Sequence, residues 1–153
     1  MKPSREPRIR TPVGWRTSAD LERGVLVSAL APRTGRHGVV PSLRLEVEPV
    51  KVPPRQWYDD TVADLAARLP GFEVHDEEIY DLGGEEACYR RFTHHRAGHD
   101  VVTEQWAWWV DGLGFTLSGC VAREDQAEHA GLFEAVAATF GFDEVAVGTR
   151  RSA

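Results

Sequence analysis

The most regular hydrophobic pattern of the chain is an alternation of apolar and polar residues from about Glu86 to Ala122, interrupted by two short turns. Asp111-Gly112 is a dipeptide that two-residue β-hairpins prefer, and Ala97-Gly98 is a weaker signal of the same kind. The pattern therefore predicts three consecutive antiparallel strands. Because a two-residue turn sets the register, it also predicts which side chains share a face of the sheet.

The predicted register divides these strands into a hydrophobic face and a mixed face. With Arg96 opposite His99 and Val110 opposite Leu113, one face collects large side chains that we expect in the core: Tyr89, Trp106, Trp108, Phe115 and Leu117. The other face is mixed, with Cys88, Arg90, Phe92, Gln105, Ala107, Trp109, Thr116 and Ser118. An apolar anchor ringed by hydrogen-bonding groups is typical of a binding surface. We therefore predict partner-binding residues on this face, namely Arg90, Phe92, Gln105, Trp109, Thr116 and Ser118. The alternative is that a helix or loop covers it.

The rest of the chain has clear strand and helix signals. Strands are predicted at 24–31, at 42–50 and, as a polar edge-like strand, at 72–82, and a loop rich in Pro and Gly fills 32–41. Pro53-Pro54 opens a helix to about Leu69. Its apolar positions recur at helical spacing: Tyr58, Val62, Leu65, Ala66 and Leu69. A second helix is predicted over 125–140, with one apolar stripe made of Phe133, Val136, Ala137 and Phe140.

This order of elements contains no repeated βαβ unit, which favours an α+β fold. We expect a mostly antiparallel sheet of about six to seven strands packed with two main helices. A length of 153 residues fits one domain. We place it at 8–142, with flexible tails at 1–7 and 148–153.

Composition and charge narrow the possible partners. A net charge of −6 argues against a nucleic-acid partner, and no stretch is apolar enough for membrane insertion. The basic N-terminus has no apolar signal region, so we expect a cytoplasmic protein. Cys88 and Cys120 would share a face but lie two strands apart, about 9.6 Å. A disulfide needs Cα atoms within about 7 Å, so we predict two reduced, half-buried thiols.

No motif in the sequence predicts catalysis, a metal or a cofactor. Neighbouring strand residues point to opposite faces, so His94 and His95 cannot both bind one ion, and with His99 we expect them at a solvated hairpin tip. A nucleophilic Cys120 would need a base within hydrogen-bond reach, and His94 lies about two strands away. The Gly83-Gly84 turn is not followed directly by a helix, as a phosphate loop would be.

Several segments together resemble a known family. They are RIRTPVGW around Trp15, SLRLEVEPV, RLPGFEV, DLGGEEACYRRFTH, WWVDGLGFTLSG and AATFGF. Over nearly the whole chain this pattern resembles the PsbP-like domains of bacteria, the LpqN/DcrB-type group. The resemblance implies an α/β/α sandwich around an antiparallel sheet, in a family whose members are mostly binding or assembly proteins rather than enzymes. One related branch, the Eag-type chaperones, is dimeric and holds apolar transmembrane helices of secreted toxins.

Two functions remain open from the sequence. The first, which we favour, is a non-catalytic protein-binding module. It would be a cytosolic chaperone or adaptor for a secreted or membrane-associated partner, including an apolar helix of a secreted effector, and it could form a homodimer. The alternative is a small-molecule-binding or hydrolytic protein with a pocket beside the 32–41 loop.

Overall fold

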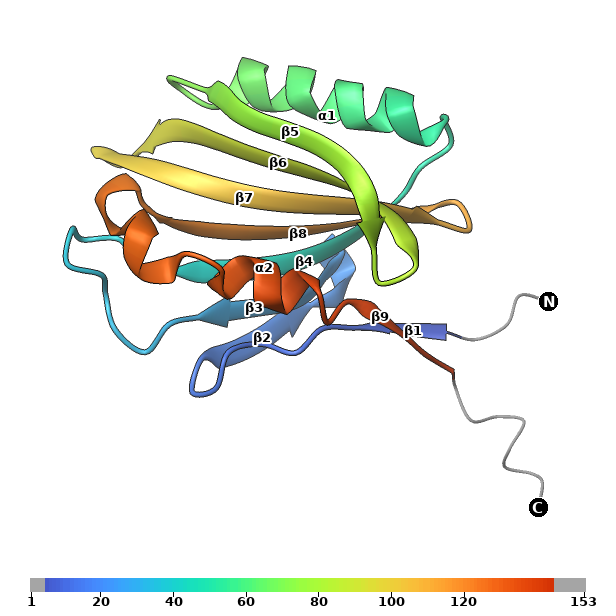
Figure 1. The fold of residues 1–153 in the computed structure, drawn as a ribbon, viewed down its shortest axis with the longest axis horizontal. Helices are drawn as coiled ribbons and strands as arrows, with labels where there is room; N and C mark the ends of the chain where they lie inside the picture. The colour runs from blue at the N-terminus through green and yellow to red at the C-terminus, as the bar shows by residue number, and fades with distance from the viewer. Residues whose placement is uncertain (1–4, 145–153) are drawn as a thin grey trace.

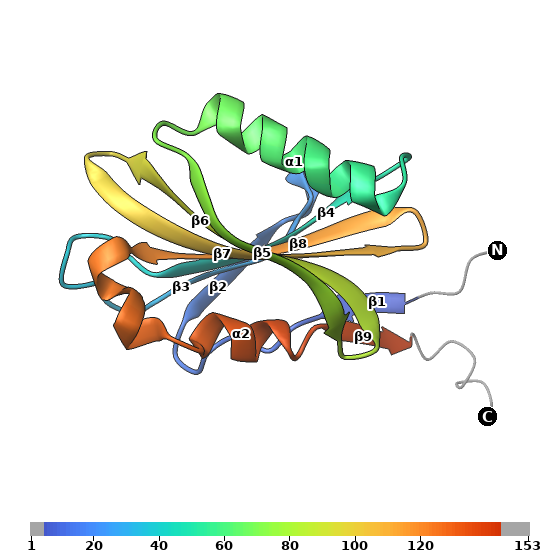
Figure 2. The same ribbon diagram turned by 45° about the horizontal axis from the view of Figure 1, so that its top comes forward.

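The computed structural model describes residues 5–144 as a three-layer arrangement of helix, sheet and helix. The central layer is a seven-stranded antiparallel sheet with the order β2-β3-β4-β8-β7-β6-β5. Helix α1 lies on one face and α2 on the other (Figure 1). Turning the molecule shows the strong twist of the sheet between them (Figure 2). The expected α+β sandwich is therefore confirmed.

Four hairpin-connected strands form one half of the sheet. They are β5 (Glu73–Leu82), β6 (Glu85–Arg96), β7 (His99–Val110) and β8 (Leu113–Ala122). The predicted pairings of Arg96 with His99 and of Val110 with Leu113 are both present. Ala97 and Asp111 have positive φ, as do the glycines that follow them, as a two-residue hairpin turn requires. The register and the two faces are therefore as predicted.

Three further strands complete the sheet: β2 (Arg16–Asp20), β3 (Val25–Leu30) and β4 (Ser42–Pro49). A 3₁₀ turn, η1 (Leu21–Arg23), connects β2 to β3. The two halves of the sheet join where β4 pairs with β8. The edges are β5, as its polar sequence indicates, and β2, which the sequence did not reveal.

Helix α1 (Pro54–Arg68) begins with proline in its first turn, where a missing N–H costs nothing. It buries Trp57, Tyr58 and Leu65 against the sheet. Ala66, which we expected on the buried stripe, is exposed. The helix therefore packs through the two aromatic residues near its start and through Leu65.

The second helical region differs from the prediction of one helix over 125–140. It consists of a 3₁₀ segment, η2 (Arg123–His129), and a short helix, α2 (Leu132–Ala137). Between them Ala130 is extended and Gly131 has a φ of 81°, so the α-helical path is broken. The predicted apolar stripe is nevertheless buried, because Phe133, Val136, Ala137 and Phe140 all face the sheet core.

A separate two-stranded sheet joins the ends of the described chain, β1 (Arg5–Arg8) and β9 (Gly141–Glu144). Residues 5–7, which we expected in a flexible tail, are thus part of a strand. Residues 1–4 and the expected tail at 148–153 lie outside the described residues. Neither helix within 5–144 has the length and apolar composition of a membrane span.

The main core lies between the sheet and α2. It contains Trp106, Trp108, Phe115 and Leu117, as the register predicted, and Tyr89 packs against it. The Trp108 ring stacks on Phe140 with centroids 4.0 Å apart. Because this face is fully packed, any binding surface on the sheet has to lie on the face that carries α1.

Candidate functional site

Helix α1 covers only half of its sheet face, and the other half forms an open groove. Side chains beneath the helix are nearly inaccessible: Arg90 is 1% exposed and Cys88 2%. Beyond the helix, on β8, β4 and β3, side chains of the same face are partly or fully exposed, as for Ser118, Arg44 and Leu30. The groove has a volume of about 1240 Å³.

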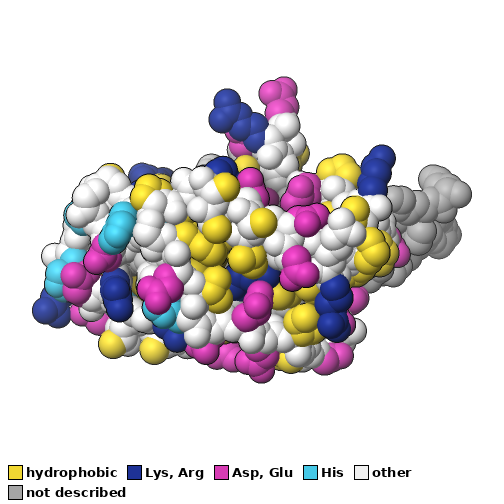
Figure 3. Space-filling view, turned by 90° about the horizontal axis from the view of Figure 1, so that it is seen from above, with side chains coloured by type: hydrophobic (Ala, Val, Ile, Leu, Met, Phe, Trp, Pro, Cys, Tyr) yellow, Lys and Arg dark blue, Asp and Glu magenta, His cyan; other side chains and the backbone are white. Residues whose placement is uncertain are grey.

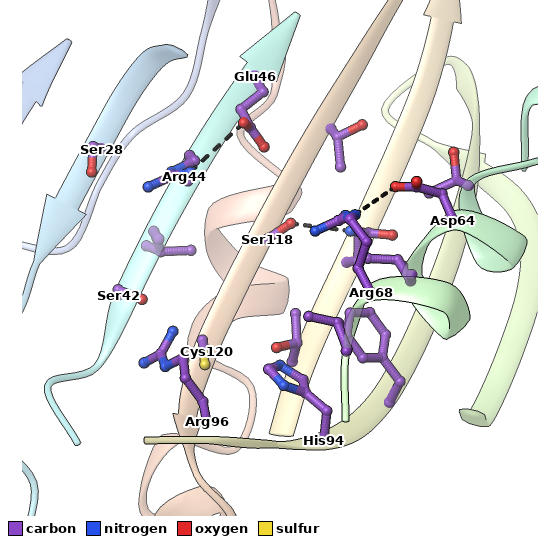
Figure 4. A pocket seen from close by; sticks show the side chains of 18 of the residues that line it. Ser28, Ser42, Arg44, Glu46, Asp64, Arg68, His94, Arg96, Ser118 and Cys120 are labelled. Carbon is purple, nitrogen blue, oxygen red and sulfur yellow. Dashed lines mark hydrogen bonds and ion pairs between the residues drawn. The ribbon is translucent and has the colours of Figure 1, made fainter. Parts of the chain in front are cut away.

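The groove is bounded by several elements. The helix α1 forms one wall and the strands β3, β4 and β8 form the floor (Figure 4). Along β8 the floor extends from Gly114 to Cys120. Six residue steps of a strand span about 20 Å. Seen from above, the molecule shows hydrophobic side chains gathered near the middle of the surface, with acidic and basic side chains around them (Figure 3).

A row of polar side chains crosses the sheet and reaches this groove. It takes one residue from each of six neighbouring strands, in the order Glu77, Arg90, Gln105, Ser118, Arg44 and Ser28. The buried guanidinium of Arg90 donates to Glu77 Oε2 (Nε···Oε2 3.0 Å) and to Gln105 Oε1 (3.3 Å). The side-chain nitrogen of Gln105 then donates to Ser118 Oγ at 3.2 Å. Arg90 lies under α1, and the four members from Gln105 to Ser28 line the groove.

The hydrogen bonds from Arg90 to Ser118 all run in one direction, because the arginine side chain has N–H donors and no acceptor. Gln105 must turn its oxygen toward Arg90 and its NH₂ group toward Ser118. Ser118 Oγ therefore accepts a hydrogen bond from Gln105, and its own O–H is left to donate into the groove. Arg44 stands next to it on β4. The open end of the row thus offers two donors to a ligand.

The α1 wall and the floor of the groove each carry charges of both signs. On α1, Arg68 and Asp64 form an ion pair with an Nε···Oδ2 distance of 2.8 Å. On β4, Arg44 and Glu46 are 3.8 Å apart (Nη1···Oε2). Together with the hydroxyl groups of the floor, these pairs give the groove a lining in which polar groups accompany apolar side chains such as Leu30 and Leu69. Such a lining suits a ligand that can return hydrogen bonds.

The far end of the groove lies against the 32–41 loop. Val39 from the loop, His94 from β6 and Cys120 from β8 meet the groove there and are largely buried. Burial lowers the pKa of His94, because desolvation penalises the imidazolium form, and the charges of Arg96 and His95 add to the effect. His94 is therefore neutral at pH 7 and adds a polar but uncharged group.

The loop itself is held against η2 by two polar side-chain contacts. His37 Nδ1 lies 2.7 Å from Oδ1 of the buried Asp125. Arg36 Nη1 donates to Glu128 Oε2 at 3.1 Å. These contacts fix the loop as the end wall of the groove.

The six predicted partner-binding residues lie in three places. Four of them line the groove: Phe92, Gln105, Thr116 and Ser118. Arg90 lies beneath α1, where its guanidinium also donates to the Tyr58 carbonyl at 3.1 Å. Trp109 is 37% exposed but lies outside the groove, and its indole nitrogen is 3.5 Å from the carbonyl oxygen of Val50. The mixed face is thus part helix-covered and part open.

The other chemical candidates from the sequence are also located. His95 is exposed and paired with Asp100, but His94 is 7% exposed, so the expectation of a solvated tip is wrong for His94. Both cysteines are free thiols, as predicted, although they are buried rather than half-buried. Burial raises the pKa of the Cys88 thiol. Within residues 5–144 no three His, Cys, Asp or Glu side chains are grouped to hold a metal ion.

Sequence reasoning missed Arg44 and Glu46 on the floor of the groove and Trp57 on its α1 wall. The polar side of β4, with Arg44 and Glu46, was visible as an alternation, but nothing in the sequence showed that β4 pairs with β8. Trp57 was missed because its ring contacts a glycine: its Cζ2 lies 2.4 Å from where a Cβ on Gly114 would stand. A glycine inside a strand is a signal of such a close approach.

Comparison with solved structures finds this architecture in several bacterial proteins. LpqN, involved in cell envelope biogenesis of Mycobacterium tuberculosis, superposes with a TM-score of 0.72 at 14% identity over 92% of this chain and 84% of LpqN. The cyanobacterial PsbP protein CyanoP from Synechocystis gives 0.59 at 15% identity over 94% and 95%. The chain has a PsbP-like, LpqN-type fold.

A third structure with the PsbP-like fold is PA94 from Pseudomonas aeruginosa, a protein of unknown function. It superposes with a TM-score of 0.67 at 14% identity, over 88% of this chain and 95% of PA94. By sequence, no protein-family model and no curated protein matches the chain. At these identities the similarity establishes the PsbP-like fold and nothing finer.

Proposed function

We propose that this chain is a non-catalytic protein-binding module, a cytosolic chaperone or adaptor that holds a segment of a partner protein in the α1 groove. The observation that carries the proposal is the polar row. A buried arginine fixes Gln105, Gln105 fixes Ser118, and Ser118 with Arg44 offers donors on an open sheet face. Because these donor groups are already held in place, little conformational entropy is lost by the protein when a ligand binds.

The lining of the groove favours a polar partner segment. Its floor includes hydroxyl, amide and charged side chains beside apolar ones such as Leu30, so an uninterrupted apolar helix would leave the polar groups without hydrogen bonds. A segment with carbonyl, amide or carboxylate acceptors would satisfy Ser118 and Arg44. About six residues in extended form, or about thirteen in a helix, cover the length of the floor. We therefore replace the apolar helix expected from the sequence by a polar or amphipathic segment.

One of the similar structures bears on the kind of partner. LpqN is involved in cell envelope biogenesis. From that similarity we infer a partner that is secreted or associated with the membrane.

A pulldown with matched variants tests the proposal. The tagged chain is incubated with lysate of its own host, and bound proteins are quantified by mass spectrometry. Ser118→Arg fills the groove with a long charged side chain, whereas Ala63→Arg adds the same side chain on the exposed surface of α1. The proposal expects a partner that binds the native chain and Ala63→Arg but is lost with Ser118→Arg.

A second step locates the contact. Overlapping synthetic peptides of the captured protein are titrated into the labelled chain, and amide shifts are followed by NMR. Shifts should concentrate at Thr116, Ser118 and Arg44. A partner that binds Ser118→Arg as tightly as the native chain, or shifts confined to other surfaces, would rule out the groove.

One observation supports the alternative, a small-molecule-binding protein. The groove ends at the 32–41 loop beside His94 and Cys120, as a pocket beside that loop requires. Native mass spectrometry of the chain purified from its host distinguishes the two. A bound small mass that Ser118→Arg removes would favour the alternative.

A further inference from the structure

The two edges of the sheet differ sharply in charge. Strand β5 carries five carboxylates, at Glu73, Asp76, Glu77, Glu78 and Asp81. Two copies of β5 placed side by side would bring like charges together, which protects this edge from self-association. Strand β2, the lower margin of the sheet in Figure 1, has the sequence Arg-Thr-Ser-Ala-Asp, and all five side chains are exposed.

Strand β2 has an available backbone edge. Within residues 5–144 its only backbone partner is β3. Edge strands are often protected by a bulge that twists them away. The irregularity here lies on β3, since the two residue steps from Ser18 to Asp20 on β2 face three steps, from Ser28 to Val25, on β3. Strand β2 therefore keeps the regular spacing that pairing needs.

The sequence of β2 is complementary to itself in the antiparallel direction. With Ser18 opposite Ser18 of a second copy, Arg16 stands opposite Asp20 and Asp20 opposite Arg16. Two opposite-charge pairs then flank an uncharged centre, and such cross-strand pairs stabilise a sheet. Any register shifted by one residue would lose both pairs.

The residues next to β2 support the same pairing. Val13 and Leu21 are 101% and 71% exposed, the two most exposed large hydrophobic residues among those described. They lie just before and just after the strand. In the register centred on Ser18, Leu21 lies opposite Trp15 of the second copy, beside its Val13. Association would thus bury apolar surface at both ends of the paired strands.

We propose that the chain forms a homodimer through antiparallel pairing of β2 with β2 of a second copy, centred on Ser18. The partner is the chain itself, and the contact joins two seven-stranded sheets into one. Strands paired in this way are related by a two-fold axis perpendicular to the sheet. Both copies then present α1 and the groove on the same side. This inference is independent of what the groove binds.

Charge reversal gives a direct test by sedimentation velocity over a concentration series at low salt. Arg16→Asp places Asp opposite Asp20, and Asp20→Arg places Arg opposite Arg16. Each variant alone should dimerise about tenfold more weakly or worse. An equimolar mixture of the two variants should dimerise like the native chain, because both cross-strand pairs are then complementary.

The control is Glu78→Arg, which reverses a charge on the exposed β5 edge and should leave the dimer unchanged. Circular dichroism of each variant checks the fold, which exposed β2 positions should not disturb. A native chain that stays monomeric throughout the series overturns the proposal. So does a dimer that neither reversal weakens, or a pair of weakened variants whose mixture stays monomeric.

Discussion

Arg90 is the residue on which the polar row depends. Its guanidinium is buried and donates to Glu77, to Gln105 and to the backbone carbonyl of Tyr58 in α1. Removing it leaves the side-chain oxygen of Gln105 and the carbonyl of Tyr58 without this donor, and unpaired buried groups are costly. The side chain therefore both fastens α1 to the sheet and orients the groove.

We predict that Arg90→Met lowers the free energy of unfolding by about 3 kcal/mol. Arg90→Lys should recover little, because an ammonium group cannot reproduce the forked contacts. Urea denaturation measures both. The neighbouring Arg91 is the control: its pair with Asp76 is partly exposed, at 2.7 Å, and Arg91→Met should cost below about 1 kcal/mol. Equal losses at the two positions would contradict the role given to Arg90.

His94 gives the molecule a predictable response to acid. Burial lowers the pKa of His94 from its ordinary value of 6.5, so the unfolded chain takes up the proton first as the pH falls. The contribution of His94 to the free energy of unfolding is complete above about pH 6.5. It is lost as the pH falls through the lower pKa that His94 has in the folded state. We expect the native chain to lose more stability between pH 7 and pH 5 than His94→Gln does. Unfolding curves across this range measure the difference, and parallel pH profiles would contradict it.

At the level of elements, strand β8 contacts a helix on each of its faces, and each contact is made at a glycine. A Cβ on Gly114 would stand 2.4 Å from Trp57 of α1, and one on Gly119 would stand 2.5 Å from Phe133 of α2. Both glycines are thus sites where an aromatic ring rests directly on the strand backbone. This explains how a central strand can carry glycine at two positions.

We predict that Gly114→Ala and Gly119→Ala each lower the free energy of unfolding by about 1–3 kcal/mol, since the rings must move from their packed positions. Ser118→Ala, on the same strand but facing the open groove, is the matched control and should change stability little. Thermal or urea unfolding of the three variants checks this. Glycine variants as stable as the native chain would show that the rings move without cost.

Elements set by local chemistry could be predicted from the sequence. The hairpin register followed from Ala97-Gly98 and Asp111-Gly112, whose backbone φ values are positive as those turns require. The break in the second helix was missed because a single glycine does not always end a helix. The apolar stripe of Phe133 to Phe140 lies wholly after Gly131, so it gave no information about the residues before the break. A local pattern predicts the face of an element better than its continuity.

The groove could be predicted only in part, because it depends on contacts between distant segments. The mixed face and four of its lining residues followed from the hairpin register. Its second half required the pairing of β4 with β8 and the position of α1, neither of which has a local signal. Strand β2 was missed because it also has no local signal. All five of its side chains are exposed, so its sequence shows no hydrophobic alternation.

As a whole, the sheet consists of two meanders joined at one seam. Strands β2 to β4 and β5 to β8 each pair with their neighbours along the chain, and only β4 with β8 joins the two groups. That seam encloses α1 and the three strands β5, β6 and β7. Closing so long a loop costs conformational entropy, and the contacts between β4 and β8 offset this cost only after the loop has closed. Local pairing should therefore come first in folding.

This topology predicts that the β5–β8 meander forms before the seam. Val102 on β7 and Leu45 on β4 are both buried in the core between the sheet and α2. We expect Val102→Ala to slow folding and give a high φ-value, and Leu45→Ala mainly to speed unfolding and give a low one. Stopped-flow folding and unfolding rates in urea measure both. A high value at Leu45 together with a low one at Val102 would mean that the β4–β8 seam, and with it the floor of the groove, organises the fold from the start.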